Sequence, residues 1–426
     1  MPVMKNYSWL VLLFLVLAGG CKEDTEIIPK STATRTNTNI QSVTAVDGSI
    51  TQVECSVETL NSGEIYQICK PANWNGELII YAHGYVNDKV PLRLSLETAA
   101  YAPLFTSLGF AFATTSLSQN GLAIQSGIQD IIRLRERFIR EFGQPSQIYL
   151  TGASEGGIVT TLAVERYPEL FSGGLSLCGP CGNFQKQVNY YANFRVLFDY
   201  FFKGVLPENA INIPEELITN WRTVYIPAIL AAIKQNPEAT LKLLRTAQAP
   251  YDPDDPTSID STVINVLKYD VLNTRDAVIK LGGQPFDNTK TVYFGTGSFW
   301  EDYKLNARVQ RFSADPVATQ NIRQYYETSG DLDKPLVMMH TTKDPIQLFW
   351  HLPLYQYKTI QEGSALSFTG IPVNRYGHCT FKEAELVSAF GLLIARVKGQ
   401  ELALLKQLLA SVNPADGKII RSVRNQ

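Results

Sequence analysis

The stretch that decides the fold is residues 148–157, IYLTGASEGG, in which an apolar run leads into a Gly-x-Ser-x-Gly motif. An apolar stretch at helical spacing follows it. A serine hydroxyl becomes a useful nucleophile when a sharp strand-to-helix turn exposes it beside a base. Gly152 and Gly156 supply the small residues that such a crowded turn needs. The same pattern also arises by chance as an ordinary turn, so the remaining sequence has to test the assignment of Ser154 as a nucleophile.

Composition excludes several other classes of function. The chain has 426 residues, and its 38 basic and 40 acidic side chains leave a net charge of −2. No basic stripe is available to hold nucleic acid, and we expect no nucleic-acid partner. The length suits a large core or two domains. A histidine base or ligand must be one of only four residues, namely His83, His340, His351 and His378.

The N-terminal residues resemble an export signal. Lys5 precedes an apolar run at residues 9–18, which is too short to span a bilayer and fits a secretory signal. The sequence AGGC at residues 18–21 resembles the lipobox of bacterial lipoproteins, which implies removal of residues 1–20 and lipidation of Cys21. An ordinary secretory signal with a cysteine near its end is the alternative. The resemblance implies an exported protein that a lipid anchors to a bacterial membrane, at the outer membrane or cell surface. Residues 21–48 are rich in Thr, Ser and Asn and predict a flexible tether.

A pair of cysteines lies in a predicted hairpin. Residues 50–55 and 65–69 read as two strands around a turn at residues 61–64. Cys55 and Cys69 are equidistant from Ser62, so an antiparallel hairpin centred there places them opposite one another. Export permits disulfides, and we expect a Cys55–Cys69 bridge. Two buried thiols are the alternative.

Short apolar strands alternate with helices over residues 49–182 and again over residues 325–426. Such alternation predicts an α/β fold with a mostly parallel central sheet and helices on both faces. Between them, residues 183–324 are helical and irregular in pattern, and we interpret them as a helical insertion. The other predicted strands are residues 78–82, 110–114, 148–150, 175–178, 335–340 and 365–368. The predicted helices of the α/β parts are residues 95–108, 121–142, 156–166, 381–398 and 401–409.

Ser154 needs a base, and the base needs a partner that fixes its tautomer. His378 follows a predicted strand and a glycine, in a loop that can reach over the sheet edge. His340 and His351 fit packed positions better, and His83 lies at a strand end well before the serine. Asp344 lies directly after the strand at residues 335–340, between the serine and the histidine in sequence. Asp331 and Asp333 are weaker choices because they precede that strand.

The order Ser, Asp, His, each just after a strand, resembles the α/β-hydrolase superfamily. The resemblance covers residues 49–182 and 325–426. It implies that Ser154 is the nucleophile, His378 the base and Asp344 the acid. The dipeptide His83-Gly84 resembles the oxyanion loop of that superfamily, and the resemblance assigns the oxyanion hole to the backbone N–H groups of Tyr85 and Glu155. It also implies that residues 183–324 form a cap over the serine.

The tetrapeptide CGPC at residues 178–181 matches the thioredoxin active site and raises the rival hypothesis of a thiol–disulfide oxidoreductase. The surrounding sequence argues against it, because the motif stands inside a longer hydrolase pattern and not at the start of a helix in a small domain. A structural role fits better. We expect a Cys181–Cys379 bridge that steadies the loop of His378, with Cys178–Cys181 as the alternative pairing.

These observations predict an exported, membrane-anchored serine hydrolase of carboxylic esters that works through an acyl-enzyme. A serine peptidase of the prolyl-peptidase type and a non-catalytic surface binding lipoprotein are the alternatives. The substrate is a small-molecule or peptide ester or amide, and the chemistry calls for no cofactor and no metal. The oligomeric state stays open.

Overall fold

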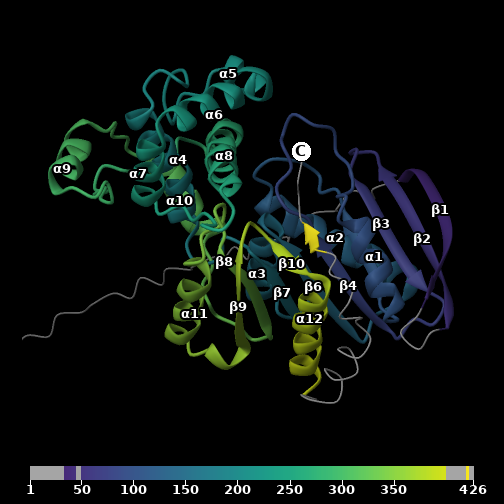
Figure 1. Ribbon diagram of the computed structural model, residues 1–426. Helices are drawn as coiled ribbons and strands as arrows, with labels where there is room; N and C mark the ends of the chain where they lie inside the picture. Colours follow the sequence, from purple (N-terminus) through teal and green to yellow (C-terminus); the bar gives the residue numbers. More distant parts are fainter. Residues whose placement is uncertain (1–32, 45–48, 400–418, 422–426) are drawn as a thin grey trace, which may run out of the picture.

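The computed structural model describes residues 33–44, 49–399 and 419–421 (Figure 1). The predicted signal at residues 1–20, Cys21 and the predicted helix at residues 401–409 lie outside these ranges. Within them, no helix combines the length and the apolar character that crossing a membrane requires.

A nine-stranded sheet in the order β1-β2-β3-β5-β4-β6-β7-β8-β9 organises the chain. The parallel part of the sheet consists of the six strands β5, β4, β6, β7, β8 and β9. Strands β1, β2 and β3 add an antiparallel edge. The mixed, mainly parallel sheet is the architecture that the sequence predicts. The strands are β1 (Ala33–Thr44), β2 (Ile50–Leu60), β3 (Ile65–Pro71), β4 (Glu77–Ala82), β5 (Ala111–Thr115), β6 (Gln147–Ala153), β7 (Gly173–Leu177), β8 (Leu336–Lys343) and β9 (Phe368–Tyr376), with β10 (Thr380–Lys382) and β11 (Ile419–Arg421) as a separate antiparallel pair.

Strand β1 corrects the prediction of a flexible tether over residues 21–48. Residues 33–44 pair along their length with β2, in an antiparallel ladder. The low apolar content that suggested a tether is also what an edge strand tolerates, since residues 37–42 are exposed. The alternating threonines are β-branched and favour an extended backbone. Backbone pairing with β2, which composition does not encode, decides between the two readings.

Helices cover both faces of the sheet because side chains alternate along each strand. In β4, Leu78 and Ile80 pack toward α2 (Ile124–Phe142) and α3 (Glu155–Arg166), whereas Ile79 and Tyr81 pack toward the opposite pair of helices. That pair is α1 (Thr98–Ser107) and α12 (Glu383–Lys398). Helix α11 (His351–Gln361) joins the α3 side.

The predicted strand at residues 365–368 is wrong. Residues Ala365–Ser367 form a short 3-10 helix, η3, and pairing with β8 begins only at Phe368, opposite Leu336. Leu366 is 92% exposed, so the apolar run that suggested a strand does not face the core.

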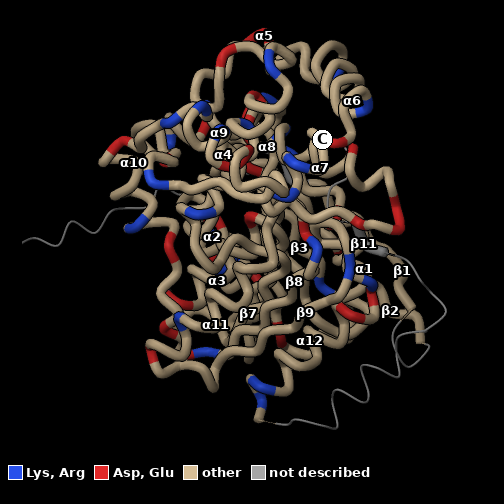
Figure 2. Tube along the Cα trace, turned by 60° about the vertical axis from the view of Figure 1, so that its left-hand side comes forward, with Lys and Arg blue, Asp and Glu red and all other residues tan. Residues whose placement is uncertain are grey.

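The segment between β7 and β8 is helical and contributes most of a second hydrophobic core, in which Phe194 and Phe198 are fully buried. Figure 1 shows these helices gathered beyond one end of the strands, the end at which Ser154 lies. Figure 2 shows basic and acidic residues interspersed over the whole molecule in that view. The helices are α4 (Phe184–Phe201), α5 (Glu215–Thr219), the π-helix η1 (Trp221–Tyr225), α6 (Ile226–Gln235), α7 (Pro237–Thr246), α8 (Thr257–Leu281), α9 (Phe299–Arg308), α10 (Pro316–Asn321) and the π-helix η2 (Ile322–Tyr326).

Candidate active site

Ser154 is the single residue between the end of β6 and the start of α3. Its backbone has φ 57° and ψ −119°, a conformation that L residues rarely adopt and that costs on the order of 1–3 kcal/mol. The backbone N–H of Ser154 donates to the Leu177 carbonyl of β7 at 2.8 Å, which helps to hold the turn. This strained turn places the serine side chain just beyond the carboxyl end of β6.

Gly152 and Gly156 are required by close backbone approach. A Cβ on Gly152 would collide with the carbonyl group of Gly156, and a Cβ on Gly156 would collide with the carbonyl group of Ala82 at the end of β4. The helix therefore starts directly against the neighbouring strand. The small residues of the motif serve the purpose that the sequence predicts for them.

The structure brings Ser154, His378 and Asp344 into one hydrogen-bonded chain. His378 Nε2 lies 2.9 Å from Ser154 Oγ, and His378 Nδ1 lies 2.7 Å from Asp344 Oδ2. Asp344 is fully buried, and its Oδ1 accepts the N–H groups of Ile346 at 2.8 Å and Gln347 at 3.0 Å. A carboxylate only accepts, so Nδ1 donates to Asp344 and leaves Nε2 of a neutral ring to accept the serine proton.

The residues that the sequence ranked lower lie elsewhere. Asp331 and Asp333 are exposed before the start of β8, at the opposite end of the strand from Asp344. The other three histidines are buried, and burial lowers the pKa of both His340 and His351. The ring nitrogens of His83 contact the carbonyl oxygens of Gly84 and Ser116. His340 contacts the carbonyl oxygen of Gln347. His351 contacts the Gly182 N–H and the Gln187 side chain.

The two residues assigned to the oxyanion hole lie next to the serine. A Cβ on Gly84 would come within 3.2 Å of Ser154 Cβ, so the backbone before Tyr85 passes against Ser154. Glu155 is the first residue of α3, where an N–H has no acceptor within its own helix. Both Tyr85 and Glu155 line the same cavity as Ser154.

Burial changes the protonation of the Glu155 side chain, which the sequence did not indicate. Its Oε1 accepts the Ala123 N–H at 2.9 Å, and burial raises the pKa of the Glu155 carboxyl to about 8. The group is therefore mainly neutral at pH 7. A neutral carboxyl adds no negative charge beside Ser154, where an anionic intermediate would form.

The predicted Cys55–Cys69 disulfide is confirmed, and the two residues face each other across β2 and β3 with Cα atoms 4.0 Å apart. The predicted Cys181–Cys379 pairing is wrong, because Cys379 is bonded to Cys178. Cys178 and Cys379 belong to the core on the α1 and α12 side of the sheet, whereas Cys181 belongs to the core on the α3 side. The sheet therefore separates Cys181 from Cys379. The predicted pairing relied on both residues lying near the carboxyl edge of the sheet, which does not indicate on which face each one lies.

Cys181 is the free cysteine among the described residues, and it is buried. Its Sγ lies 3.2 Å from Thr161 Oγ1 and 3.5 Å from Ser176 Oγ. Burial raises the pKa of the Cys181 thiol to about 11, whereas redox-active thiols have a lowered pKa. Because Cys178 is bonded elsewhere and Cys181 is inert, the CGPC motif is not a redox pair.

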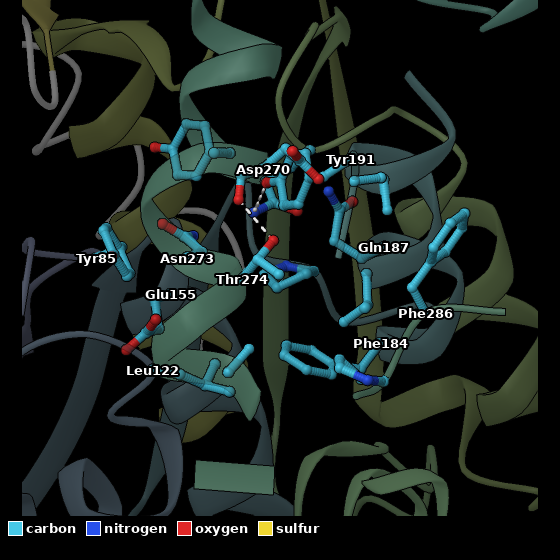
Figure 3. Close-up of a pocket in the computed structure, with 18 of the residues that line it drawn as sticks. Tyr85, Leu122, Glu155, Phe184, Gln187, Tyr191, Asp270, Asn273, Thr274 and Phe286 are labelled. Carbon is cyan, nitrogen blue, oxygen red and sulfur yellow. Dashed lines mark hydrogen bonds between the residues drawn. The ribbon is translucent and has the colours of Figure 1, made fainter. Parts of the chain in front are cut away.

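A cavity of about 90 Å³ opens beside Ser154, between the end of the sheet and the helices of residues 184–326 (Figure 3). Its wall is mainly apolar and aromatic. A Tyr191–Tyr269 pair on α4 and α8 stacks with ring centroids 5.2 Å apart. The apolar and aromatic lining includes Tyr85, Leu122, Ile124, Phe184, Val188, Tyr191, Ile211, Tyr269 and Phe286.

One family model matches residues 30–295, which is more than half of the chain. Its description is a tannase-like family of unknown function (DUF6351). The chain belongs to this tannase-like family. The region that defines the family includes the Ser154 turn and α4 to α8, whereas Asp344 and His378 lie beyond its end. No curated protein matches the chain.

Solved structures resemble the chain weakly. Feruloyl esterase B from Aspergillus oryzae is 15% identical over 83% of this chain and 81% of that one, with a TM-score of 0.41. Candida antarctica lipase A in its closed state is 12% identical over 91% and 93%, with a TM-score of 0.44. The chain spans only 38% of the Pyrococcus horikoshii acylaminoacyl peptidase, at 13% identity and a TM-score of 0.37. At these values the likenesses carry no inference about activity.

Proposed function

We propose that this protein is a serine hydrolase that cleaves carboxylic esters through an acyl-enzyme. The observation that carries the proposal is the hydrogen-bonded chain from Ser154 through His378 to the buried Asp344. The strained backbone of Ser154 adds support, because such strain persists mainly at functional sites. The tannase-like description of the family also favours an ester bond, since tannase is an esterase.

In the proposed mechanism, Ser154 Oγ attacks the ester carbonyl while His378 Nε2 takes the serine proton. Asp344 holds the ring in the required tautomer and stabilises its positive charge. The oxyanion accepts hydrogen bonds from the backbone N–H groups of Glu155 and Tyr85. His378 then returns the proton to the leaving alcohol, and a water molecule, activated by the same histidine, releases the acid from Ser154.

A fluorophosphonate probe tests whether Ser154 is a nucleophile at all. We expect the purified protein without its N-terminal 32 residues to be labelled at one serine, and the Ser154→Ala variant to remain unlabelled. The alternative of a non-catalytic surface binding protein predicts no labelling of either. Absence of labelling in the well-folded protein would reject the enzyme proposal.

A substrate panel separates ester hydrolysis from the peptidase alternative. We expect hydrolysis of esters with apolar groups, which suit the apolar cavity beside Ser154, and no turnover by Ser154→Ala. Cleavage of proline-containing peptides without activity on short acyl esters would favour the prolyl-peptidase type and overturn the ester proposal.

Removing the Cys178–Cys379 disulfide should lower turnover more than it disturbs the core. Cys379 follows His378 directly, and the bridge ties its loop to the residue after β7. Without it, the imidazole has more freedom to leave Ser154, and we expect kcat to fall roughly 10- to 100-fold in Cys178→Ser/Cys379→Ser. Steady-state kinetics of samples that circular dichroism shows to be folded measures this fall.

The second disulfide provides the matched control. Cys55→Ser/Cys69→Ser removes a bridge between β2 and β3, away from the serine, and should reduce the unfolding temperature while kcat stays near the wild-type value. Equal kcat in both double variants would mean that the Cys178–Cys379 bridge does not position His378.

We also propose that the protein is exported and lipidated at Cys21, which rests on the lipobox-like residues 18–21. Expressed at full length in a bacterial host, the protein should incorporate a radiolabelled fatty acid and sediment with membranes. The Cys21→Ser variant should do neither. Incorporation that persists in Cys21→Ser would reject this site of lipidation.

A further inference from the structure

A buried carboxyl group that the proposed mechanism does not use lies in the wall of the cavity beside Ser154. Asp270 on α8 is 1% exposed and lines this cavity, and neither of its carboxyl oxygens has a hydrogen-bond partner. Figure 3 shows Asp270 above Asn273 and Thr274 on the same helix, with Glu155 and Leu122 at the lower side of the view. Asp270 therefore lies away from the side of the cavity where Glu155 adjoins the serine.

The neighbouring Arg195 forms an ion pair with Asp270 but no hydrogen bond. Arg195 on α4 is fully buried, and its Nε donates to both carboxylate oxygens of Asp199 at 2.8 and 2.9 Å. Its Nη2 donates to the Pro207 carbonyl at 2.7 Å. The remaining nitrogen, Nη1, lies 3.8 Å from Asp270 Oδ2, which is beyond hydrogen-bond distance. Arg195 therefore lies between Asp199 and Asp270, and because its Nη1 makes no hydrogen bond, both carboxyl oxygens of Asp270 are left without a hydrogen-bond donor.

Two further residues of the cavity wall carry acceptor atoms without hydrogen-bond partners. Asn273 Oδ1, one helical turn beyond Asp270, has no hydrogen-bond partner, and neither has Gln347 Oε1. Buried polar atoms are nearly always hydrogen-bonded, and leaving them unpaired costs free energy. The unpaired oxygens of Asp270 and Asn273, one helical turn apart in the wall of a mainly apolar cavity, therefore call for a hydrogen-bond donor from a bound molecule.

We propose that Asp270 and Asn273 form a subsite for a hydroxyl group of the substrate. The acyl or alkyl part of the ester that occupies the cavity is then apolar along its length, where it contacts the aromatic wall. It ends in a hydroxyl that donates a hydrogen bond to these acceptors. An ammonium group is a poorer fit, because it would lie close to the buried guanidinium of Arg195. The inference rests on the proposed ester hydrolysis and adds the substrate class to it.

Matched ester pairs test the subsite. One set consists of 4-nitrophenyl esters of linear acids with and without a terminal hydroxyl, lengthened one carbon at a time, together with the 3-phenylpropanoate and 3-(4-hydroxyphenyl)propanoate pair. A second set, the acetates of linear alkanols and of the corresponding diols, places the hydroxyl on the alcohol side. We expect the hydroxyl to raise kcat/KM about 10- to 100-fold in at least one pair. Hydrolysis of the plain esters with no gain in any pair overturns the subsite but leaves the proposed function intact.

Variants locate the effect. Asp270→Leu and Asn273→Leu should each remove most of the preference for the hydroxylated ester, while Asp260→Leu, which makes the same change on α8 at a surface ion pair with Lys234, should keep it. The subsite is rejected if the preference survives both cavity variants, or if Asp260→Leu loses it equally. Calorimetric binding of the same diols and alkanols to Ser154→Ala needs neither turnover nor a stable Asp270 variant. If no ester is cleaved, the proposed function fails, whereas equal binding of diol and alkanol rejects the subsite.

Discussion

His378→Ala is expected to lower kcat about 10⁴- to 10⁶-fold on any ester that the wild-type protein hydrolyses. The reason is the position of the ring, since His378 Nε2 is 2.9 Å from Ser154 Oγ and each of the other three histidines is buried with other partners. Without this ring the serine proton has no acceptor within reach. Steady-state kinetics of the purified variant, with a correction for residual wild-type protein, measures the effect.

Two controls make the result specific to the base. Added imidazole should restore part of the activity of His378→Ala, since the small molecule can occupy the space that the ring leaves. His351→Gln changes a buried histidine on α11 that touches neither Ser154 nor Asp344. This variant should have a lower unfolding temperature, while its kcat stays near the wild-type value. Near-normal turnover in His378→Ala would identify another residue as the base.

Asp344→Asn is expected to lower kcat about 10⁴-fold while the protein stays folded. An asparagine can still accept the N–H groups of Ile346 and Gln347 through one oxygen, so the turn after β8 survives. The other atom becomes an NH₂ group that faces His378 Nδ1. The ring must then carry its proton on Nε2, which cannot take a proton from Ser154 in that tautomer.

The chain itself offers matched controls for this substitution. Asp331→Asn and Asp333→Asn make the same chemical change at exposed positions before the start of β8, and both should leave kcat near the wild-type value. A large loss in either variant, or turnover close to wild type in Asp344→Asn, would show that Asp344 does not orient the histidine.

Features that depend on neighbours along the chain could be predicted from the sequence. The Ser154 turn is one, because a Gly-x-Ser-x-Gly motif between a strand and a helix specifies local backbone geometry. The Cys55–Cys69 bridge is another, since hairpin register follows from counting residues on each side of a turn. The choice of His378 and Asp344 was possible because histidine is rare in this chain and because parallel strands end at one edge of the sheet.

Other features were decided only by the tertiary structure. Cys178 and Cys181 are three residues apart in sequence, but they lie on opposite sides of the sheet, and that alone determines which of them bonds Cys379. Strand β1 has the composition of a tether and is ordered by backbone pairing with β2. Asp270 belongs to a helix far from Ser154 in sequence, so its burial in the cavity wall depends on how α4 and α8 pack over the sheet. The Ser154 turn is a local property of the sequence, whereas the Cys178–Cys379 disulfide, the cavity and its unpaired acceptors arise from contacts between distant segments.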